Sequence, residues 1–311
     1  MNEIEISVIV PTYFHEKYVG EALDTILCQE IDCAYEIVIA DDASQDGTVG
    51  IVNKYKEKYP DIIQIHVNER NLGICRNMYE AYLRCRGKYI VLSAGDDYWI
   101  DNRKLQKQYD FLEKNEEFVA ECTVIECRYS DGQITKNPHS PQEKYRGLEF
   151  RREDFLNGNI YPTSGMMFRN VFVQHAAKEQ FGLIPRFCRD IDDLVFSMFI
   201  FDYGKVHISN EITYVVRARR EEEKDKNFNS KYRGVTNYIE HLKLLNKLDE
   251  YYNKKYELKK WYESMFQSLI YNIYTGRQWS AVRYVKLVPA KYWLEFGWNY
   301  LKEIVNAIVK K

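Results

Sequence analysis

Two adjacent carboxylates, Asp96 and Asp97, follow the apolar run Tyr89 to Leu92 after three small residues. Neighbouring carboxylates at a strand end repel each other unless a positive charge lies beside them, so a divalent cation would relieve the pair. Magnesium is usually held by one or two carboxylates together with substrate phosphates, which points to a ligand that carries a diphosphate. The structural alternative is a solvated pair that caps the helix expected to begin near Asn102.

Three further polar clusters each follow a strand-like run. Asp, Asn, Ser and Gly are common in turns and helix caps, so each cluster alone would have a structural interpretation. Ser44 and Thr48 keep that interpretation, whereas Asp42 is a candidate for ligand contact. The coincidence of four clusters at four strand ends is what indicates a binding site. The members of the three clusters are Pro11, Thr12, Tyr13, His15 and Glu16; Asp41, Asp42, Ser44 and Thr48; and Asn71, Gly73, Arg76 and Asn77.

The chain around these clusters alternates short β-branched runs with helical patterns. Such alternation builds a doubly wound parallel sheet, in which ligands bind at the carboxyl ends of the strands. The predicted fold class is therefore α/β, with a mostly parallel, Rossmann-like central sheet flanked by helices. The predicted strands are 6–10, 35–40, 62–67 and 88–93, and the predicted helices are 17–29, 48–58 and 73–86.

The middle of the chain is expected to extend this sheet. A strand-like stretch runs from Val119 to Tyr129 and a second from Ser164 to Arg169. A helix is predicted over 194–203, followed by two final strands over 206–209 and 212–217. We therefore predict one domain over 1–218, which divides into a first half over about 1–115 and a second half over about 116–218. The charged segment 219–231 is the predicted linker.

The C-terminal region, 232–311, is predicted to be entirely helical. Its last segment places apolar residues on one stripe at spacings of three and four, and basic residues outnumber acidic ones from Arg277 onward. A basic amphipathic helix of this kind suits a membrane surface. The alternative is that the stripe packs on the first domain or forms a homodimer. The stripe consists of Leu294, Trp298, Leu301, Val305 and Ile308.

The overall composition excludes several classes of protein. Lys and Arg total 44 against 46 Asp and Glu, a net charge of −2, so no general attraction to nucleic acid is expected. No apolar run approaches the ~20 residues that span a bilayer, and the first residues do not resemble a signal peptide. The expected location is cytoplasmic, extending to the inner face of the cell membrane. The seven cysteines have no zinc-binding spacing and are expected to be reduced.

Taken together, the four motifs resemble those of the family 2 glycosyltransferases. These are inverting enzymes of the GT-A fold that use nucleotide-diphosphate sugars. The resemblance implies that 1–218 is the catalytic domain, with a nucleotide-sugar half over about 1–115 and an acceptor half over about 116–218. The resemblance covers about residues 5–115, weakens through the middle of the chain and is absent after about residue 220. The matching segments are Ser7 to Tyr13, Ile39 to Thr48, Asn71 to Gly73, and Gly95 to Trp99.

The resemblance implies roles for particular residues on the donor side. Asp42, or its neighbour Asp41, would hydrogen-bond the nucleobase, Asp96 would lie near the ribose, and Asp97 would bind Mg²⁺ or Mn²⁺. The family often has a further acid just ahead of this pair, whereas this chain has Ser93, Ala94 and Gly95. We therefore expect modest cation affinity without the donor. Thr12 and Tyr13 would line the base pocket, and Pro11, Glu16, Asn71, Gly73 and Arg76 complete the predicted nucleotide-binding set.

The resemblance also implies a catalytic base at the start of a late helix. The segment Arg189 to Phe196 matches that region of the family, and Asp193 is our choice for the base. Asp190 and Asp192 stay open as alternatives, because the three acids lie within four positions. On the acceptor side, the resemblance assigns Thr163 and Ser164 to the acceptor loop.

The expected activity is metal-dependent, inverting glycosyl transfer of the hexosyl or N-acetylhexosaminyl class. UDP is the preferred nucleotide by resemblance, and the acceptor is a hydroxyl of a glycan or lipid-linked glycan in surface polysaccharide synthesis. Neither G-x-G-x-x-G nor G-x-x-x-x-G-K-[ST] follows the first strand, which disfavours a dinucleotide-dependent oxidoreductase and a P-loop nucleotidase. The remaining alternative is a non-catalytic scaffold that binds a nucleotide sugar or glycan.

Overall fold

The computed structural model describes residues 3–135, 143–190, 193–218, 235–297 and 299. The chain divides into two units. The first unit contains Met1–Arg152 and Ile160–Arg220, and the second contains Glu153–Asn159 and Glu221–Lys311. The short segment Glu153–Asn159 therefore belongs with the C-terminal helices, although the sequence places it within the acceptor half.

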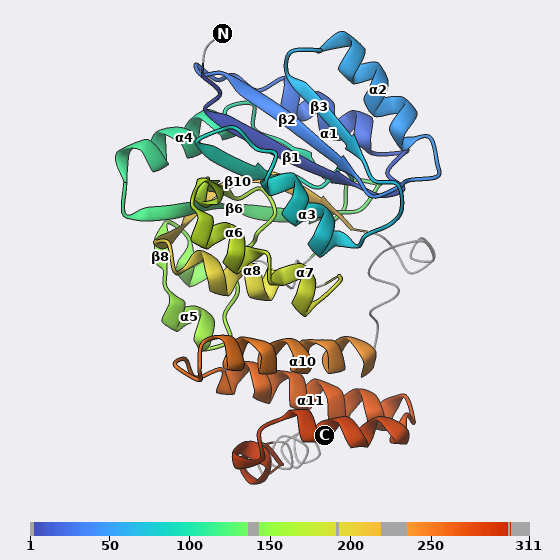
Figure 1. Ribbon diagram of the computed structural model, residues 1–311, viewed down its shortest axis with the longest axis vertical. Coiled ribbons are helices and arrows are strands. Elements are labelled where there is room, and N and C mark those ends of the chain that lie inside the picture. Colours follow the sequence, from blue (N-terminus) through green and yellow to red (C-terminus); the bar gives the residue numbers. More distant parts are fainter. Residues whose placement is uncertain (1–2, 136–142, 191–192, 219–234, 298, 300–311) are drawn as a thin grey trace. The chain divides into compact units, whose positions relative to one another are not determined.

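Within the described residues, a ten-stranded sheet organises the first unit (Figure 1). Its four parallel strands lie in the order β3-β2-β1-β4, and Val8 in β1 pairs with Ile37 in β2 and Val91 in β4. These three side chains are fully buried, as expected for parallel strands that helices cover. The predicted α/β class with a mostly parallel sheet is confirmed. The strands are β1 (Ile6–Thr12), β2 (Tyr35–Asp41), β3 (Ile63–Val67) and β4 (Tyr89–Leu92).

Three helices connect these strands and supply much of the core. Val19, Leu23 and Ile26 recur at spacings of four and three on one helix, and all three are fully buried. The buried side chains of this helix belong to the same hydrophobic cluster as those of β1 and β2. The connecting helices are α1 (Val19–Leu27), α2 (Thr48–Lys58) and α3 (Ile74–Tyr82).

The remaining strands complete the sheet with mixed directions. β9 (Met167–Arg169) lies antiparallel between β4 and β6 (Phe118–Arg128), and β10 (Lys205–Arg217) runs parallel to β6. The sequence predicted two final strands, but the structure has one. Irregular register between Ile208 and Ile212 lets a single strand continue past the polar residues between them. The shorter strands are β5 (Tyr98–Trp99), β7 (Ile134–Thr135) and β8 (Leu148–Phe150).

Helices of the acceptor half pack beside α3 and the sheet. α3 contacts α7, and α6 contacts α8, so these helices form one neighbouring group in Figure 1. Aromatic rings of Tyr82, Phe168 and Phe196 meet in this layer. The helices of this half are α6 (His175–Phe181), α7 (Ile184–Phe187) and α8 (Asp193–Ile200), with short 3₁₀ helices at Glu143–Tyr145 and Val171–Val173. Of the other helices, α4 (Lys104–Lys114) follows β5 in the chain, and α5 (Arg152–Leu156) belongs to the second unit apart from Arg152.

The described residues of the second unit form helices joined by turns, with no strand among them. α10 (Val235–Tyr251) packs against α11 (Lys259–Thr275), and both contact the 3₁₀ helix η4 (Trp279–Leu287), which η5 (Ala290–Tyr292) follows. The segment that begins at Glu153 is held here by a 2.7 Å hydrogen bond from Trp261 Nε1 to the Phe155 carbonyl. None of the described helices is both long and apolar enough to cross a membrane.

Two expectations for the C-terminal part fall largely on residues that are not described. The predicted linker 219–231 lies outside the described residues. Of the predicted apolar stripe, Leu294 is described and is 91% exposed. Trp298, Leu301, Val305 and Ile308 lie outside the described residues, so contact by this stripe with a membrane or a second copy stays a prediction.

Candidate active site

The loops that follow β1, β2 and β4 meet at one edge of the sheet. Thr12 and Asp41 are paired at the ends of their strands. The Ser93 amide donates to the Ile9 carbonyl at 3.0 Å, and the Gly95 amide donates to the Pro11 carbonyl at 3.1 Å. Because the carboxyl ends of parallel strands share an edge, polar clusters far apart in sequence become neighbours here.

The first two loops hold each other in a strained conformation. Phe14 and Ala43 have positive φ values of 58° and 64°, which is uncommon for residues other than glycine and unusual for a bulky aromatic. The amide of Phe14 donates to Ser44 Oγ at 3.0 Å, and the amide of His15 donates to Thr48 Oγ1 at 2.9 Å. Ser44 and Thr48 thus have the structural role that the sequence indicated. Backbone strain of this kind concentrates at ligand sites.

The fully buried carboxylate of Asp41 connects these two strand ends. One oxygen accepts hydrogen bonds from Thr12 Oγ1 at 2.7 Å and Ser44 Oγ at 2.6 Å, and the other accepts from the Ser44 amide at 2.8 Å. Asp41 therefore links the end of β1, at Thr12, to the loop after β2 that contains Ser44. A direct contact between Asp41 and a nucleobase stays a prediction.

The buried carboxylate of Asp42 holds the loop after β3. It accepts hydrogen bonds from the amides of Leu72 and Gly73 at 2.7 and 2.9 Å, and from the side chains of Asn68 and Asn71, both at 2.9 Å. Four donors use the ordinary accepting capacity of a carboxylate. A nucleobase would have to replace one of them, so the predicted base contact of Asp42 also stays a prediction.

Several predicted nucleotide-binding residues are exposed at this edge. The rings of Tyr13 and Phe14 meet edge to face at 4.6 Å, and both are exposed to solvent. Glu16 accepts a hydrogen bond from the Gly47 amide at 3.0 Å, which links the first two loops again. Arg76 Nε lies 2.6 Å from Glu80 on the same helix, so its charge is partly balanced. Tyr13 therefore offers an exposed aromatic surface beside the strand ends on which a base could stack.

The two acids after β4 lie in different environments. Asp97 is buried, and its oxygens accept hydrogen bonds from Tyr214 Oη and the Arg217 amide, both at 3.0 Å. Burial raises the pKa of Asp97 well above its ordinary value, and the negative charge of Asp96 raises it further. The two hydrogen bonds to Asp97 act in the opposite direction and lower its pKa. Asp96 is half-buried, and its carboxylate lies 3.8 Å from His15 Nε2. The two carboxylates, Asp96 and Asp97, thus repel each other electrostatically, as the sequence predicted.

This pair fits a divalent cation that takes its other ligands from substrate. No group of three His, Cys, Asp or Glu side chains arranged for a metal occurs in the described part of the chain. A side chain at position 95 would not fit, because a Cβ on Gly95 would lie 2.7 Å from Thr12 Cγ2 and 2.9 Å from His15 Nδ1. Magnesium and manganese accept one or two carboxylates when phosphates complete the shell. Asp96 and Asp97 are the residues that would hold such an ion.

The predicted acceptor-side residues come together at the start of α8. Asp193 is the first residue of this helix, and its carboxylate accepts a 2.9 Å hydrogen bond from Thr163 Oγ1. Asp193 is exposed, whereas Asp190 is buried. Asp192 lies outside the described residues, and Ser164 is half-buried beside Thr163. Of the two candidate bases that the structure describes, Asp193 is therefore the one open to a substrate.

The segment before α8 packs directly on the loop after β3. The Cys75 amide donates to the Arg189 carbonyl at 3.1 Å, and the Arg189 guanidinium hydrogen-bonds Asn71. Gly73 has φ of +88°, and a Cβ there would lie 2.5 Å from Arg189 Cγ and 2.7 Å from the Arg189 carbonyl oxygen. Gly73 thus allows the close approach of donor-side and acceptor-side segments.

Sequence reasoning missed the residues of β10 that complete this site. Tyr214 Oη accepts a hydrogen bond from the Ala94 amide at 3.0 Å while donating to Asp97. The Arg217 guanidinium lies 4.6 Å from the Tyr98 ring centroid. Both residues follow the acid pair by more than a hundred positions, and no local motif surrounds them, so short-range patterns could not identify them.

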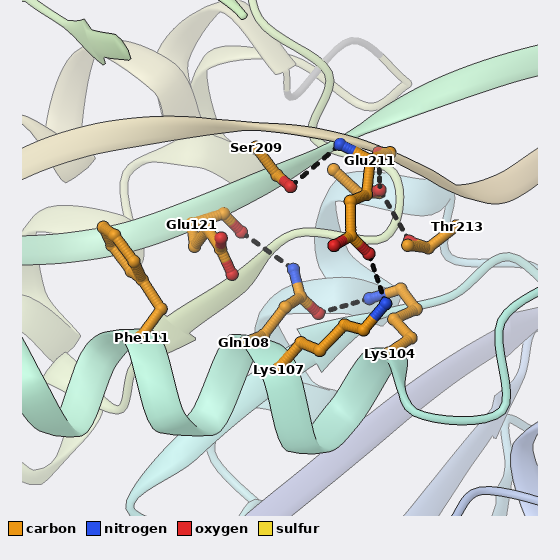
Figure 2. Close-up of a pocket in the computed structure, with 9 residues that line it drawn as sticks. Lys104, Lys107, Gln108, Phe111, Glu121, Ser209, Glu211 and Thr213 are labelled. Carbon is orange, nitrogen blue, oxygen red and sulfur yellow. Dashed lines mark hydrogen bonds and ion pairs between the residues drawn. The ribbon is translucent and has the colours of Figure 1, made fainter. Parts of the chain in front are cut away.

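A separate cavity of about 210 Å³ lies between α4 and strands β6 and β10 (Figure 2). Its wall contains the fully buried Lys104, whose Nζ donates to the Gly165 carbonyl at 2.7 Å. Burial lowers the pKa of Lys104 to about 7. None of the predicted site residues lines this cavity, so it is distinct from the strand-end site.

Comparisons with known proteins bear on the function of this arrangement. The family model described as "Glycosyl transferase family 2" matches residues 7–175. The chain is 27% identical over 224 residues to the poly(ribitol-phosphate) beta-glucosyltransferase of Bacillus spizizenii, which covers 71% of this chain and 33% of the relative. The chain spans about half or less of the length of the curated relatives that it matches.

Solved structures show the same fold at low sequence identity. Staphylococcus aureus TarS 1-349 in complex with UDP-GlcNAc has a TM-score of 0.62 at 19% identity, covering 92% of this chain and 82% of that chain. The mannosyltransferase PcManGT from Pyrobaculum calidifontis, in complex with GDP-Man and Mn²⁺, has a TM-score of 0.57 at 16% identity, covering 98% of this chain and 80% of that chain. These likenesses show a GT-A fold.

Proposed function

Because the chain belongs to glycosyl transferase family 2, we propose that it is an inverting glycosyltransferase that moves a sugar from a nucleotide-diphosphate donor to a hydroxyl acceptor. One observation carries this proposal. The segment Arg189–Asp190, just before the helix of the candidate base, packs on the Asn71–Gly73 loop of the donor side. This contact supports the proposal, because it brings together, within one unit, the segments that we expect to bind the donor and the acceptor.

The chemistry assigned to Asp193 follows from its surroundings. The acceptor hydroxyl forms a bond to the anomeric carbon while the nucleoside diphosphate leaves from the opposite face, so the configuration inverts. The hydroxyl is a poor nucleophile, and Asp193 takes its proton as the bond forms. Thr163 donates a hydrogen bond to one carboxylate oxygen of Asp193 and so orients the other toward the acceptor.

The donor-side residues bind and orient the nucleotide in this proposal. Tyr13 stacks on the base, and the loops anchored by Asp41 and Asp42 shape the pocket around it. Asp96 lies near the ribose, and Asp96 and Asp97 hold Mg²⁺ or Mn²⁺. When bound, the metal supplies positive charge that stabilises the leaving diphosphate.

The donor and acceptor classes rest on the relatives. The Bacillus relative is named for glucosyl transfer to poly(ribitol phosphate), and the TarS structure contains UDP-GlcNAc. These names favour a UDP-linked hexose or N-acetylhexosamine as the donor. They also favour a glycan or lipid-linked glycan acceptor in surface polysaccharide synthesis, which would place the protein at the inner face of the cell membrane.

Calorimetric titration of UDP, GDP, dTDP and CMP tests the donor half of this proposal. Each nucleotide is titrated into the full chain with Mn²⁺ and again with EDTA, and the series is repeated with Asp97→Asn. The expected result is Mn²⁺-dependent binding of one nucleoside diphosphate that the substitution weakens by at least about tenfold. Absence of binding by every nucleotide to folded protein would overturn the donor site.

Turnover separates the enzyme from a non-catalytic scaffold of the same fold. Release of the nucleoside diphosphate from the matching nucleotide sugar is followed in the wild type and in Asp193→Asn. Hydrolysis or transfer by the wild type that falls with the substitution supports the assigned base. Nucleotide-sugar binding that is equal in both proteins, with no turnover in either, would favour the scaffold.

A further inference from the structure

Aromatic and basic side chains are exposed near the end of α11 and along η4 in the second unit. Tyr271 and Tyr274 lie one turn apart near the end of α11, and Trp279 and Val282 follow in η4. These four side chains are 60%, 68%, 60% and 48% exposed. Together with Arg277, Arg283 and Lys286, they are called the aromatic–basic surface below.

The geometry places these apolar side chains next to one another. Residues three apart share a side of both an α-helix and a 3₁₀ helix, so Tyr271 lies beside Tyr274, and Trp279 lies beside Val282. The rings of Tyr274 and Trp279 meet edge to face at 6.3 Å, which joins the two pairs across the turn. Exposed apolar residues are ordinary when scattered, but a contiguous group indicates an interaction site.

The charge along this segment of the sequence has one sign. No Asp or Glu occurs from Ser264 to Leu294, whereas four basic residues do: Arg277, Arg283, Lys286 and Lys291. The whole chain has a net charge of −2, so this concentration of positive charge is local. The Arg283 guanidinium lies 5.0 Å from the centroid of the neighbouring Tyr284 ring, which keeps the cation beside the aromatic group.

We propose that the aromatic–basic surface binds the anionic surface of a lipid bilayer. Trp and Tyr rings prefer the boundary between lipid headgroups and acyl chains, and Lys and Arg are attracted to anionic headgroups. A second copy of this chain fits less well, because a twofold contact would place two copies of the same basic surface against each other. The proposal is independent of the assigned catalytic roles, since every residue concerned lies in the second unit.

Vesicle sedimentation with the full chain tests this proposal. Wild-type protein is expected to sediment with phosphatidylcholine vesicles that contain phosphatidylglycerol, and much less with pure phosphatidylcholine. Reversing two charges, in Arg283→Glu/Lys286→Glu, is expected to weaken the partitioning by about tenfold or more. Trp279→Ala is expected to weaken it severalfold at high salt as well, because the lost contact is apolar.

The first unit offers a matched control for the charge reversal. Lys54→Glu/Lys58→Glu changes the net charge by the same amount on α2, and Lys58 lies over the Tyr59 ring at 5.1 Å as Arg283 lies over Tyr284. The control is expected to sediment as the wild type does. Equal loss in both double variants would show a general charge effect and overturn the proposal.

Two further results would also overturn the proposal. One is a lipid-free dimer, seen by sedimentation velocity, that Trp279→Ala dissociates, because the surface would then bind a second copy. The other is tighter binding to soluble polyphosphate than to anionic vesicles, lost in the same variants. UDP titration of every variant keeps this test separate from the donor site. The donor-site residues all lie in the first unit, so UDP affinity should not change in the variants of the second unit.

Discussion

The hydroxyl of Tyr214 donates a 3.0 Å hydrogen bond to the carboxylate of Asp97, 117 positions earlier in the chain. The same hydroxyl accepts from the Ala94 amide, so one buried group holds both ends of the acidic loop after β4. Strand β10 thereby positions the acid pair that β4 presents.

Replacing Tyr214 with Phe is expected to loosen this loop. The substitution leaves the Ala94 amide and one oxygen of Asp97 without that partner, which costs about 1–3 kcal/mol of unfolding free energy for buried groups. Mn²⁺-dependent UDP affinity should fall by about tenfold in calorimetry, because the acid pair loses its fixed orientation.

Tyr161→Phe provides a matched control for this substitution. Tyr161 is also buried, but its hydroxyl makes only a long 3.5 Å contact with the Ser197 carbonyl. Removing the Tyr161 hydroxyl is expected to lower the unfolding free energy by less than about 1 kcal/mol and to leave UDP affinity unchanged. Equal UDP affinity in wild type and Tyr214→Phe would show that the hydroxyl does not organise the donor site.

Asp193→Asn is expected to reduce kcat by about 10²- to 10⁴-fold while UDP affinity is retained. The amide keeps the shape of the side chain and the contact with Thr163 but cannot take a proton. Thr163→Val should have a smaller effect, about two- to tenfold, since it removes only the orienting hydrogen bond. Steady-state kinetics with the matched donor checks both values, and an unchanged kcat in Asp193→Asn would reassign the base to Asp190 or Asp192.

Gly73→Ala is expected to destabilise the protein through two separate effects. The residue has φ of +88°, and the added Cβ would also lie 2.7 Å from the Arg189 carbonyl oxygen. Gly132 has a similar φ of +83°, but a Cβ there would meet no atom within 4 Å, so Gly132→Ala measures the backbone effect alone. In denaturant unfolding, Gly73→Ala should lower the unfolding free energy by about 1–3 kcal/mol more than Gly132→Ala does. Equal losses of unfolding free energy in the two variants would mean that the loop containing Gly73 can move away from Arg189 with little loss of stability.

Lys104 should make stability depend on pH above neutrality. Its pKa is about 7 in the folded protein and ~10.4 in an unfolded chain, so between these values the unfolded state binds the additional proton. The unfolding free energy should therefore rise with pH across this window by about 1.4 kcal/mol per unit from this residue. Lys104→Met, which removes the charge at similar volume, should lack this contribution. Parallel stability curves for the two proteins between about pH 7 and about pH 10 would contradict the lowered pKa.

The sequence alone determined the parts of this protein that depend on neighbouring residues. Apolar runs such as Ile6–Thr12, alternating with periodic segments such as Val19–Leu27, predicted the parallel sheet because period and burial are local properties. The clusters at strand ends followed from the same pattern, since parallel strands place their carboxyl ends together. The family resemblance rests on those clusters.

Only the tertiary structure decided how individual side chains are used. The sequence presented Asp42 as a ligand contact, whereas the fold surrounds its carboxylate with four protein donors. It did not indicate Tyr214, because a hydrogen bond across 117 positions depends on which strands become neighbours. Long-range packing produces the four hydrogen bonds to Asp42, the close approach at Gly73 and the burial of Lys104. Such packing depends on the whole chain, so no short segment of the sequence could predict it.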